Sequence, residues 1–197
     1  NRYIFATNLG SDTLVRGRFD AATGALSELD LAAAKTKPGA GPRHFRFHPN
    51  GRYLYLINEL DASLNAYCFD SATGALSEIQ SVSNLPPPGF TDKPWAADLH
   101  LTPDGRFLYG SERKSSTIAG FAVDGASGRL TPIGSAETET QPRGFAIDPS
   151  GRYLLAAGQI SNALSVHAIE PQTGALRRLK QYKTGLNRSW LEIVELP

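Results

Sequence analysis

The chain repeats itself about every 50 residues, and this periodicity limits its fold more than any other feature. The motif TGAL occurs three times and SGRL stands once in the same register. The glycines of this motif are 50, 54 and 46 residues apart: Gly24, Gly74, Gly128 and Gly174. A second marker recurs in step with the first, as HPNGRYLYL, TPDGRFLYG and DPSGRYLLA, and the opening NRYIFA fits a fourth copy. Repetition at this period is typical of solenoids and propellers, in which each unit buries its surface against the next.

Each copy is predicted to contain four short strands and no helix. In the second copy, His44–His48 alternates polar and apolar residues, as a strand with one apolar face does. A Pro-Asn-Gly turn follows, and Asn-Gly supplies the backbone conformations of a tight hairpin. Tyr53–Asn58 and Leu64–Phe69 are the next two strands, and the fourth begins near Ala75. The sequence therefore predicts an all-β fold, a β-propeller of four-stranded antiparallel blades.

We expect a single domain over residues 1–197, with blades at approximately 1–35, 41–84, 94–137 and 141–184. The last stretch, SWLEIVELP, ends in a proline that matches the proline of the second marker. Residues 186–197 are therefore predicted to supply a first strand that completes the first blade. Four blades could close as a ring, or they could be the C-terminal portion of a larger one. The chain has no methionine, which favours the larger ring.

Composition excludes several classes of partner and site. The formal net charge is +1 and the two signs are mixed along the chain, so no surface for nucleic acid or an anionic membrane is predicted. No apolar run is long enough to span a membrane. A single cysteine, Cys68, allows no internal disulfide and is expected to be a buried, inert thiol. No metal-ligand spacing occurs, so we expect no metal and no cofactor. Without a visible targeting signal, we expect the cytoplasm.

Alignment of the copies separates residues that serve the fold from residues that serve a site. Fold residues should recur at equivalent positions, and the first strands do share apolar positions. One such position holds Phe45, Leu99, Phe145 and Ile193, and another holds Phe47, Leu101 and Ile147. These residues are predicted to form the core. The polar residues beside them differ from copy to copy, which indicates asymmetric use of a symmetric scaffold.

The polar residues that do not recur are expected to meet on one face of the ring. They lie at the starts of first strands and the ends of second strands, and these positions are adjacent in an antiparallel pair. The converging set is Arg43, His44, Glu59, Asp98, Glu112, Arg113, Arg143 and Gln159. The stiff linker NLPPPGFTDKPW carries Trp95 toward the same face. A convergent polar set of this kind predicts a binding site.

Three segments resemble the lactonase-type seven-bladed propeller family: GPRHFRFHPNGRYLYLINEL, PWAADLHLTPDGRFLY and TETQPRGFAIDPSGRYLLAAGQ. Its members include bacterial 6-phosphogluconolactonases and 3-carboxy-cis,cis-muconate lactonizing enzymes. The resemblance covers essentially the whole chain and implies that about four blades of a seven-bladed ring are present. It also implies that His44 and Arg143 occupy functional positions of the family. Further residues within its recurring motifs are Glu59, Asp98, His100 and Gln159.

The function implied is a lactone hydrolase of the 6-phosphogluconolactonase type, acting on a small anionic lactone. Opening a δ-lactone requires a general base for water and stabilisation of an oxyanion. We assign the base to His44 or Glu59, and we expect Arg143 to stabilise the oxyanion or to bind the substrate anion. The substrate-binding residues expected are Arg43, Asp98, His100, Glu112, Arg113, Gln159 and Trp95. Arginines suit this role because they bind phosphate or carboxylate through two hydrogen bonds.

Two alternatives stay open at this point. The first is cycloisomerisation of a carboxymuconate, which uses the same scaffold and also has an anionic substrate. The second is a non-catalytic propeller that binds a ligand or a protein partner. If blades are missing, unpaired strand edges are also expected to promote self-association, because an open edge is a template for another strand.

Overall fold

The computed structural model describes residues 2–86, 90–187 and 190–194, and it confirms the all-β prediction. Fifteen strands form four antiparallel sheets, and the helical structure among the described residues is one short 3-10 turn, η1 (Leu9–Ser11). Three sheets have four strands each, in the orders β4-β5-β6-β7, β8-β9-β10-β11 and β12-β13-β14-β15. The first sheet has three strands, in the order β1-β2-β3.

Strand bounds recur from sheet to sheet, as the repeats require. The first strands are β4 (Pro42–Phe47), β8 (Ala96–Leu101) and β12 (Pro142–Ile147). The second strands are β1 (Tyr3–Asn8), β5 (Tyr53–Asn58), β9 (Phe107–Glu112) and β13 (Tyr153–Gly158). The third strands are β2 (Thr13–Phe19), β6 (Ser63–Phe69), β10 (Thr117–Val123) and β14 (Ala163–Ile169). The fourth strands are β3 (Leu26–Lys35), β7 (Leu76–Ser83), β11 (Leu130–Glu137) and β15 (Leu176–Lys183).

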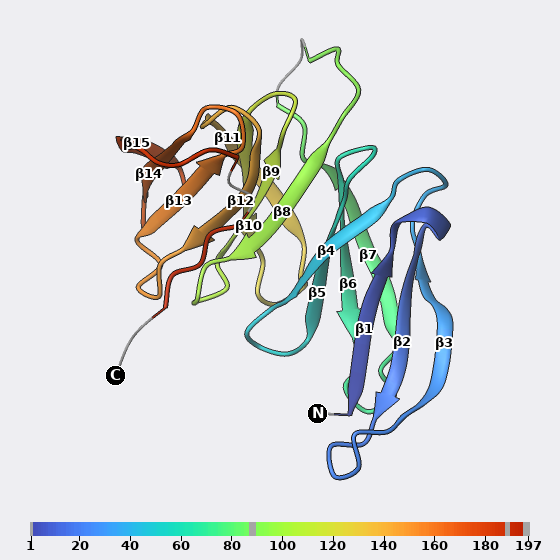
Figure 1. The fold of residues 1–197 in the computed structure, drawn as a ribbon. Coiled ribbons are helices and arrows are strands. Elements are labelled where there is room, and N and C mark those ends of the chain that lie inside the picture. The colour runs from blue at the N-terminus through green and yellow to red at the C-terminus, as the bar shows by residue number, and fades with distance from the viewer. Residues whose placement is uncertain (1, 87–89, 188–189, 195–197) are drawn as a thin grey trace.

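The sheets stand side by side in chain order along an arc (Figure 1). The first strands contact one another across the sheets, β4 against β8 and β8 against β12, so they line the inner side of the arc. Apolar side chains fill the spaces between sheets, and the largest cluster includes Tyr55, Leu64, Leu99 and Phe121, each at most 1% exposed. The inner strand β8 is therefore held by packing on both sides.

The two sequence markers recur because they touch each other across neighbouring sheets. The Tyr55 hydroxyl donates to the carbonyl of Gly128 at 3.1 Å, and the Tyr109 hydroxyl donates to that of Gly174 at 2.7 Å. The ring of Tyr53 also lies over Gly128, and a Cβ there would come within 2.5 Å of it. Gly74, Gly128 and Gly174 are therefore contact points for aromatic residues of the second marker, whereas a Cβ at Gly24 would meet no atom within 4 Å.

Replacement of Gly128 by alanine is expected to destabilise the fold more than the same change at Gly39. Both residues have a positive φ, +73° and +79°, but a Cβ at Gly39 would meet no atom within 4 Å. The Gly39 variant should lose about 1–2 kcal/mol of unfolding free energy from backbone strain alone. The Gly128 variant should lose a further 1–3 kcal/mol or so, because Tyr53 must move. Urea unfolding of the two variants measures the difference, and equal losses would contradict the contact between markers.

The strand expected over 186–197 is not formed, and this prediction was wrong for the residues that can be described. Residues 190–194 contain no strand, and β1 has no partner on its inner edge among the described ranges. Residues 195–197 lie outside the described part. The arc explains the difference, because the first and last sheets stand at its two ends and residues 190–194 lie on the side of the last sheet (Figure 1).

The first sheet has no first strand among the described residues, and this also changes the surroundings of Phe47. This residue was expected in the core, but 38% of it is exposed. It packs edge-on against Phe5 and Phe69, with ring centroids 5.6 and 5.0 Å away. No described strand lies beside β1 on this side, so the aromatic cluster stays open to solvent. Cys68, expected to be buried, is also exposed because it lies near the end of β6.

Candidate active site

A bulge at the same place in each inner strand gives the site its shape. The pairing of β4, β8 and β12 with their second strands shifts at Pro42/His44, Ala96/Leu99 and Pro142/Gly144. Bulges re-aim side chains and are common beside active sites. The bulge allows Arg43 and His44, which are adjacent in sequence, both to reach β8. Arg43 Nη1 donates to the carbonyl of Ala97, and the His44 ring contacts Asp98.

His44 and His100 share the buried carboxylate of Asp98. His44 Nδ1 lies 2.9 Å from Asp98 Oδ1, and His100 Nε2 lies 3.1 Å from Oδ2. Only 3% of the Asp98 side chain is exposed. Burial alone would raise the pKa of Asp98, but hydrogen bonds from His100 and His44 outweigh it and hold the pKa far below its ordinary value. Asp98 is therefore a carboxylate that accepts an N–H from His44 Nδ1, and this assigns the lone pair of the neutral ring to Nε2.

Ser111 fixes the backbone of Asp98, and sequence reasoning missed it. Its side-chain oxygen accepts a hydrogen bond from the Asp98 backbone N–H at 2.9 Å, and it is fully buried. The equivalent positions in the other sheets are Ile57, Ala157 and Thr7. A serine where two copies have apolar residues is the kind of difference that the alignment of copies detects, so the signal was present in the sequence.

Glu59 forms ion pairs with two arginines and accepts a hydrogen bond from an indole. Its Oε2 pairs with Arg43 Nε at 2.8 Å, and its Oε1 pairs with Arg113 Nη2 at 3.0 Å. Oε1 also accepts the indole N–H of Trp95 at 2.8 Å. Burial raises the pKa of Glu59, but the Trp95 hydrogen bond and the two arginines more than offset this and lower it overall. A carboxylate with both oxygens occupied and a lowered pKa is a poor general base.

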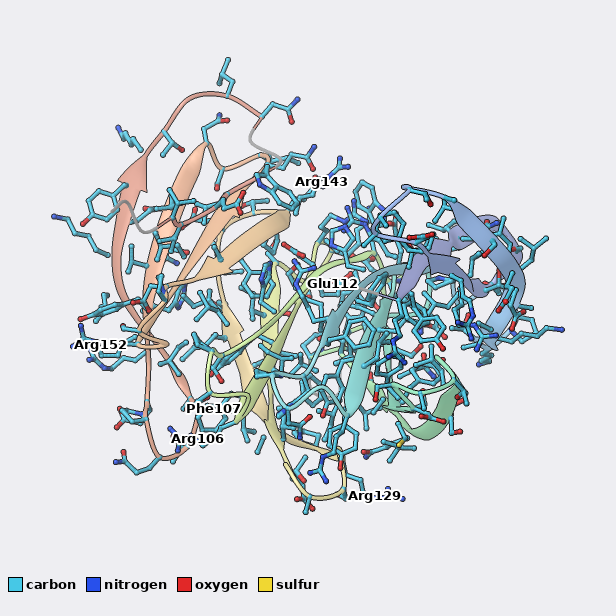
Figure 2. All side chains as sticks on the ribbon, turned by 90° about the horizontal axis from the view of Figure 1, so that it is seen from below. Arg106, Phe107, Glu112, Arg129, Arg143 and Arg152 are labelled. Atoms are coloured by element: carbon cyan, nitrogen blue, oxygen red, sulfur yellow. The ribbon has the colours of Figure 1, made fainter. Side chains whose placement is uncertain are left out.

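Arg143 is the one predicted arginine without a partner in the described ranges, since it makes no hydrogen bond or ion pair there. Its charge lies near enough to Arg43 and Arg113 to lower the pKa of both, in addition to the lowering by burial. Figure 2 shows it in the middle of the molecule, where the inner strands meet, whereas Arg129 and Arg152 lie at the periphery. Two guanidinium groups thus pair with one carboxylate and a third lies near them, which leaves a positive charge that an anion could neutralise.

Trp95 and Glu112 make contacts within the protein, and the substrate contacts expected for them stay predictions. The Arg113 guanidinium lies 3.7 Å from the centre of a Trp95 ring, in a cation–π contact, so the indole positions Arg113 as well as Glu59. Glu112 is fully buried. Its Oε1 accepts the backbone N–H of Trp95 at 2.6 Å, and its Oε2 accepts the backbone N–H and hydroxyl of Ser115. Glu112 therefore braces the loops on either side.

Gln159 lies apart from the groups described above. Its backbone N–H donates to the carbonyl of Gln141 at 3.0 Å, and its side chain makes no hydrogen bond within the described residues. It occupies the same register in the last sheet as Glu59 and Arg113 do in theirs, but the structure shows no contact with them. In the described part of the chain, no three His, Cys, Asp or Glu side chains are grouped to hold a metal ion, and no helix could cross a membrane.

Comparison with known proteins identifies the family of the chain. The family model described as lactonase, 7-bladed beta-propeller, matches residues 1–192. The chain belongs to this family. A 6-phosphogluconolactonase of Pectobacterium carotovorum is 44% identical over 196 residues, and one of Erwinia tasmaniensis is 43% identical over 196 residues. Each alignment covers 100% of this chain but 58% of the relative, so the chain spans a little over half of the length of these proteins.

Two solved structures are similar in fold to this chain over most of its length. The periplasmic gluconolactonase of Pseudomonas aeruginosa is 35% identical, with a TM-score of 0.84 over 94% of this chain and 52% of that one. A protein from Lactobacillus plantarum is 31% identical, with a TM-score of 0.89 over 98% of this chain and 55% of that one. The likeness confirms the propeller fold and the resemblance inferred from the sequence.

Proposed function

We propose that the protein is a lactone hydrolase that opens a phosphorylated sugar δ-lactone, of the 6-phosphogluconolactone type. One observation carries the proposal. A histidine oriented by a buried carboxylate lies beside a cluster of three arginines, one of which has no partner in the described residues. The arginines suit a phosphate, and His44 suits the activation of water. The names of the relatives support this choice of substrate.

The geometry favours His44 over Glu59 as the base. In the tautomer that donates Nδ1–H to Asp98, Nε2 of His44 can take a proton from water. Arg43 Nη1 lies 3.1 Å from this nitrogen, so the guanidinium group must turn toward the substrate anion before Nε2 can accept a proton. Water oxygen then bonds to the carbonyl carbon, the ring C–O bond breaks, and the proton held by His44 passes to the leaving ring oxygen. A guanidinium group of the site stabilises the oxyanion formed in between, and Arg143 binds the substrate anion.

Two substitutions in the protein expressed from its whole gene test this assignment. His44→Ala should lower kcat for 6-phosphogluconolactone by about 100-fold or more, with KM little changed, because general-base catalysis is worth that much. Arg143→Ala should mainly raise KM, since it removes an anion contact. Wild-type turnover in both variants would contradict the proposal. Turnover of carboxymuconate alone would identify a cycloisomerase, and turnover of neither would identify a binding protein.

The cellular compartment stays a prediction. The cytoplasm was expected from the sequence, whereas one of the solved relatives is named as periplasmic.

A further inference from the structure

Arg46 is a further cation near the site, outside the three-arginine cluster of Arg43, Arg113 and Arg143. Most of its hydrogen-bond donors have no acceptor in the described residues. Its Nη1 donates to the carbonyl of Phe45 at 3.2 Å, and its Nη2 lies 3.4 Å from His100 Nε2. The same His100 nitrogen lies 3.1 Å from Asp98 Oδ2. One ring nitrogen cannot donate to Asp98 and accept from Arg46 at once. At least three of the five guanidinium N–H groups therefore have no acceptor within the described residues, and no carboxylate pairs with Arg46 there.

Arg46 lies farther along β4 than the proposed base, His44, on the side away from the three-arginine cluster. His44 and Arg46 are two residues apart on β4, so they share a face and are separated by about 7 Å along the strand. Asp98 and His100 have the same relation on β8. The site therefore has the three-arginine cluster at one end, His44 in the middle and Arg46 with His100 farther along the strands.

Lactone opening creates an anion that the substrate lacks. Addition of water to the carbonyl carbon and cleavage of the ring C–O bond give a carboxylic acid and a hydroxyl group, and the acid releases its proton near neutral pH. A phosphorylated sugar lactone thus becomes an open chain with phosphate at one end and carboxylate at the other. The site as a whole offers a cation for each end, with the base between them.

We infer that Arg46 binds the carboxylate formed by lactone opening, while the cluster of Arg43, Arg113 and Arg143 holds the phosphate. This inference rests on the proposed function. Arg46 is then specific for the opened product and for the oxyanion that precedes it, because the oxygen atoms of the oxyanion become those of the carboxylate. The arrangement explains why a solvent-accessible arginine lies beside His100 without an acidic partner in the described part of the chain.

A pair of ligands that differ in the carboxylate tests the inference. 6-Phosphogluconate carries both anions, whereas glucitol 6-phosphate has the same carbon chain and phosphate without the carboxylate. Titration calorimetry on the protein expressed from its whole gene should show about 10- to 100-fold tighter binding of 6-phosphogluconate, as expected for a charged hydrogen bond. Arg46→Gln should bring this ratio close to one and leave the affinity for glucitol 6-phosphate unchanged, and Arg46→Lys should restore part of it.

Arg106→Gln is the matched control, because Arg106 is an exposed arginine in the turn before β9 and should keep the ratio. Thermal unfolding of each variant checks that the fold is retained. Persistence of the ratio in Arg46→Gln would overturn the role of Arg46 and leave the proposed function standing. Failure of the wild type to bind either ligand would overturn both.

Discussion

Replacement of Asp98 by asparagine is expected to lower kcat for lactone opening by about 100-fold or more, with a small effect on KM. Asparagine keeps the shape of the side chain but turns one acceptor oxygen into a donor. His44 and His100 both rely on this carboxylate, at 2.9 and 3.1 Å, so one of them loses its acceptor. A donor facing His44 Nδ1 forces the proton onto Nε2, and the ring can then no longer accept a proton from water.

The experiment compares kcat and KM of wild type and Asp98→Asn over a range of pH. Asp30→Asn is the control, because Asp30 pairs with Arg16 at 3.6 Å on an exposed strand and 44% of its side chain is accessible. The control should keep the wild-type pH profile, and Asp98→Asn should stay slow at every pH. Full activity of Asp98→Asn would show that His44 is oriented by other groups or is not the base.

Replacement of Glu59 by glutamine is expected to lower the free energy of unfolding by about 3–5 kcal/mol, the usual loss when one partner of a buried ion pair is removed. Glu59 is the only carboxylate paired with Arg43 and Arg113 in the described ranges, and these two side chains are 14% and 3% exposed. Without it, Arg43, Arg113 and Arg143 repel one another, and the nearest remaining counter-charge for Arg43 is Asp98. The loss should appear in urea unfolding at neutral pH.

Added phosphate and pH separate this effect from ordinary destabilisation. Phosphate should stabilise Glu59→Gln more than wild type, because it supplies the missing counter-charge to the folded state alone. The pKa of Glu59 is lowered by folding, so its contribution is present above the ordinary value of about 4 and is lost as pH falls through the folded-state pKa. The difference between wild type and variant should therefore shrink below about pH 4.

Glu28→Gln is the control for Glu59, since Glu28 pairs with Arg18 at an exposed position and should cost less than about 1 kcal/mol. The Glu59→Gln variant also distinguishes the two roles considered for Glu59. If Glu59 is the general base, Glu59→Gln should lose turnover and keep its stability, whereas if Glu59 only holds the arginines, the variant should lose stability. Unchanged stability in Glu59→Gln would contradict the structural role.

The strands could be read from the sequence because their signals are local. Alternation along His44–His48 and the Pro-Asn-Gly turn depend on neighbouring residues, and β4 and β5 begin and end within two residues of the predicted limits. The strand expected at 186–197 depended on where the two ends of the chain lie in space, and no local pattern carries that information. The exposure of Phe47 follows from the same cause.

The clustering of the polar residues was also predictable, but their contacts were not. Differences between copies identified Asp98, Glu59 and Glu112 as unlike their counterparts, and Asp98 and Glu59 contact the adjacent residues His44 and Arg43 of β4. Their roles depend on which oxygen atoms are already occupied. Glu112 is satisfied by the backbone of Trp95 and Ser115, and Glu59 by arginines and an indole, and neither contact has a sequence signature. Roles for the predicted site residues remain proposals.

The two ends of each inner hairpin differ in the residues that they carry. The bulges and polar side chains lie where the first strands begin, and the Gly-containing turns of the second marker, such as 102–105 and 148–151, lie at the far end. Attachment through those turns would leave the arginines and His44 facing away from a support. A cysteine placed at Ser150, together with removal of the exposed Cys68, would therefore immobilise the protein on a surface in one orientation with its site accessible.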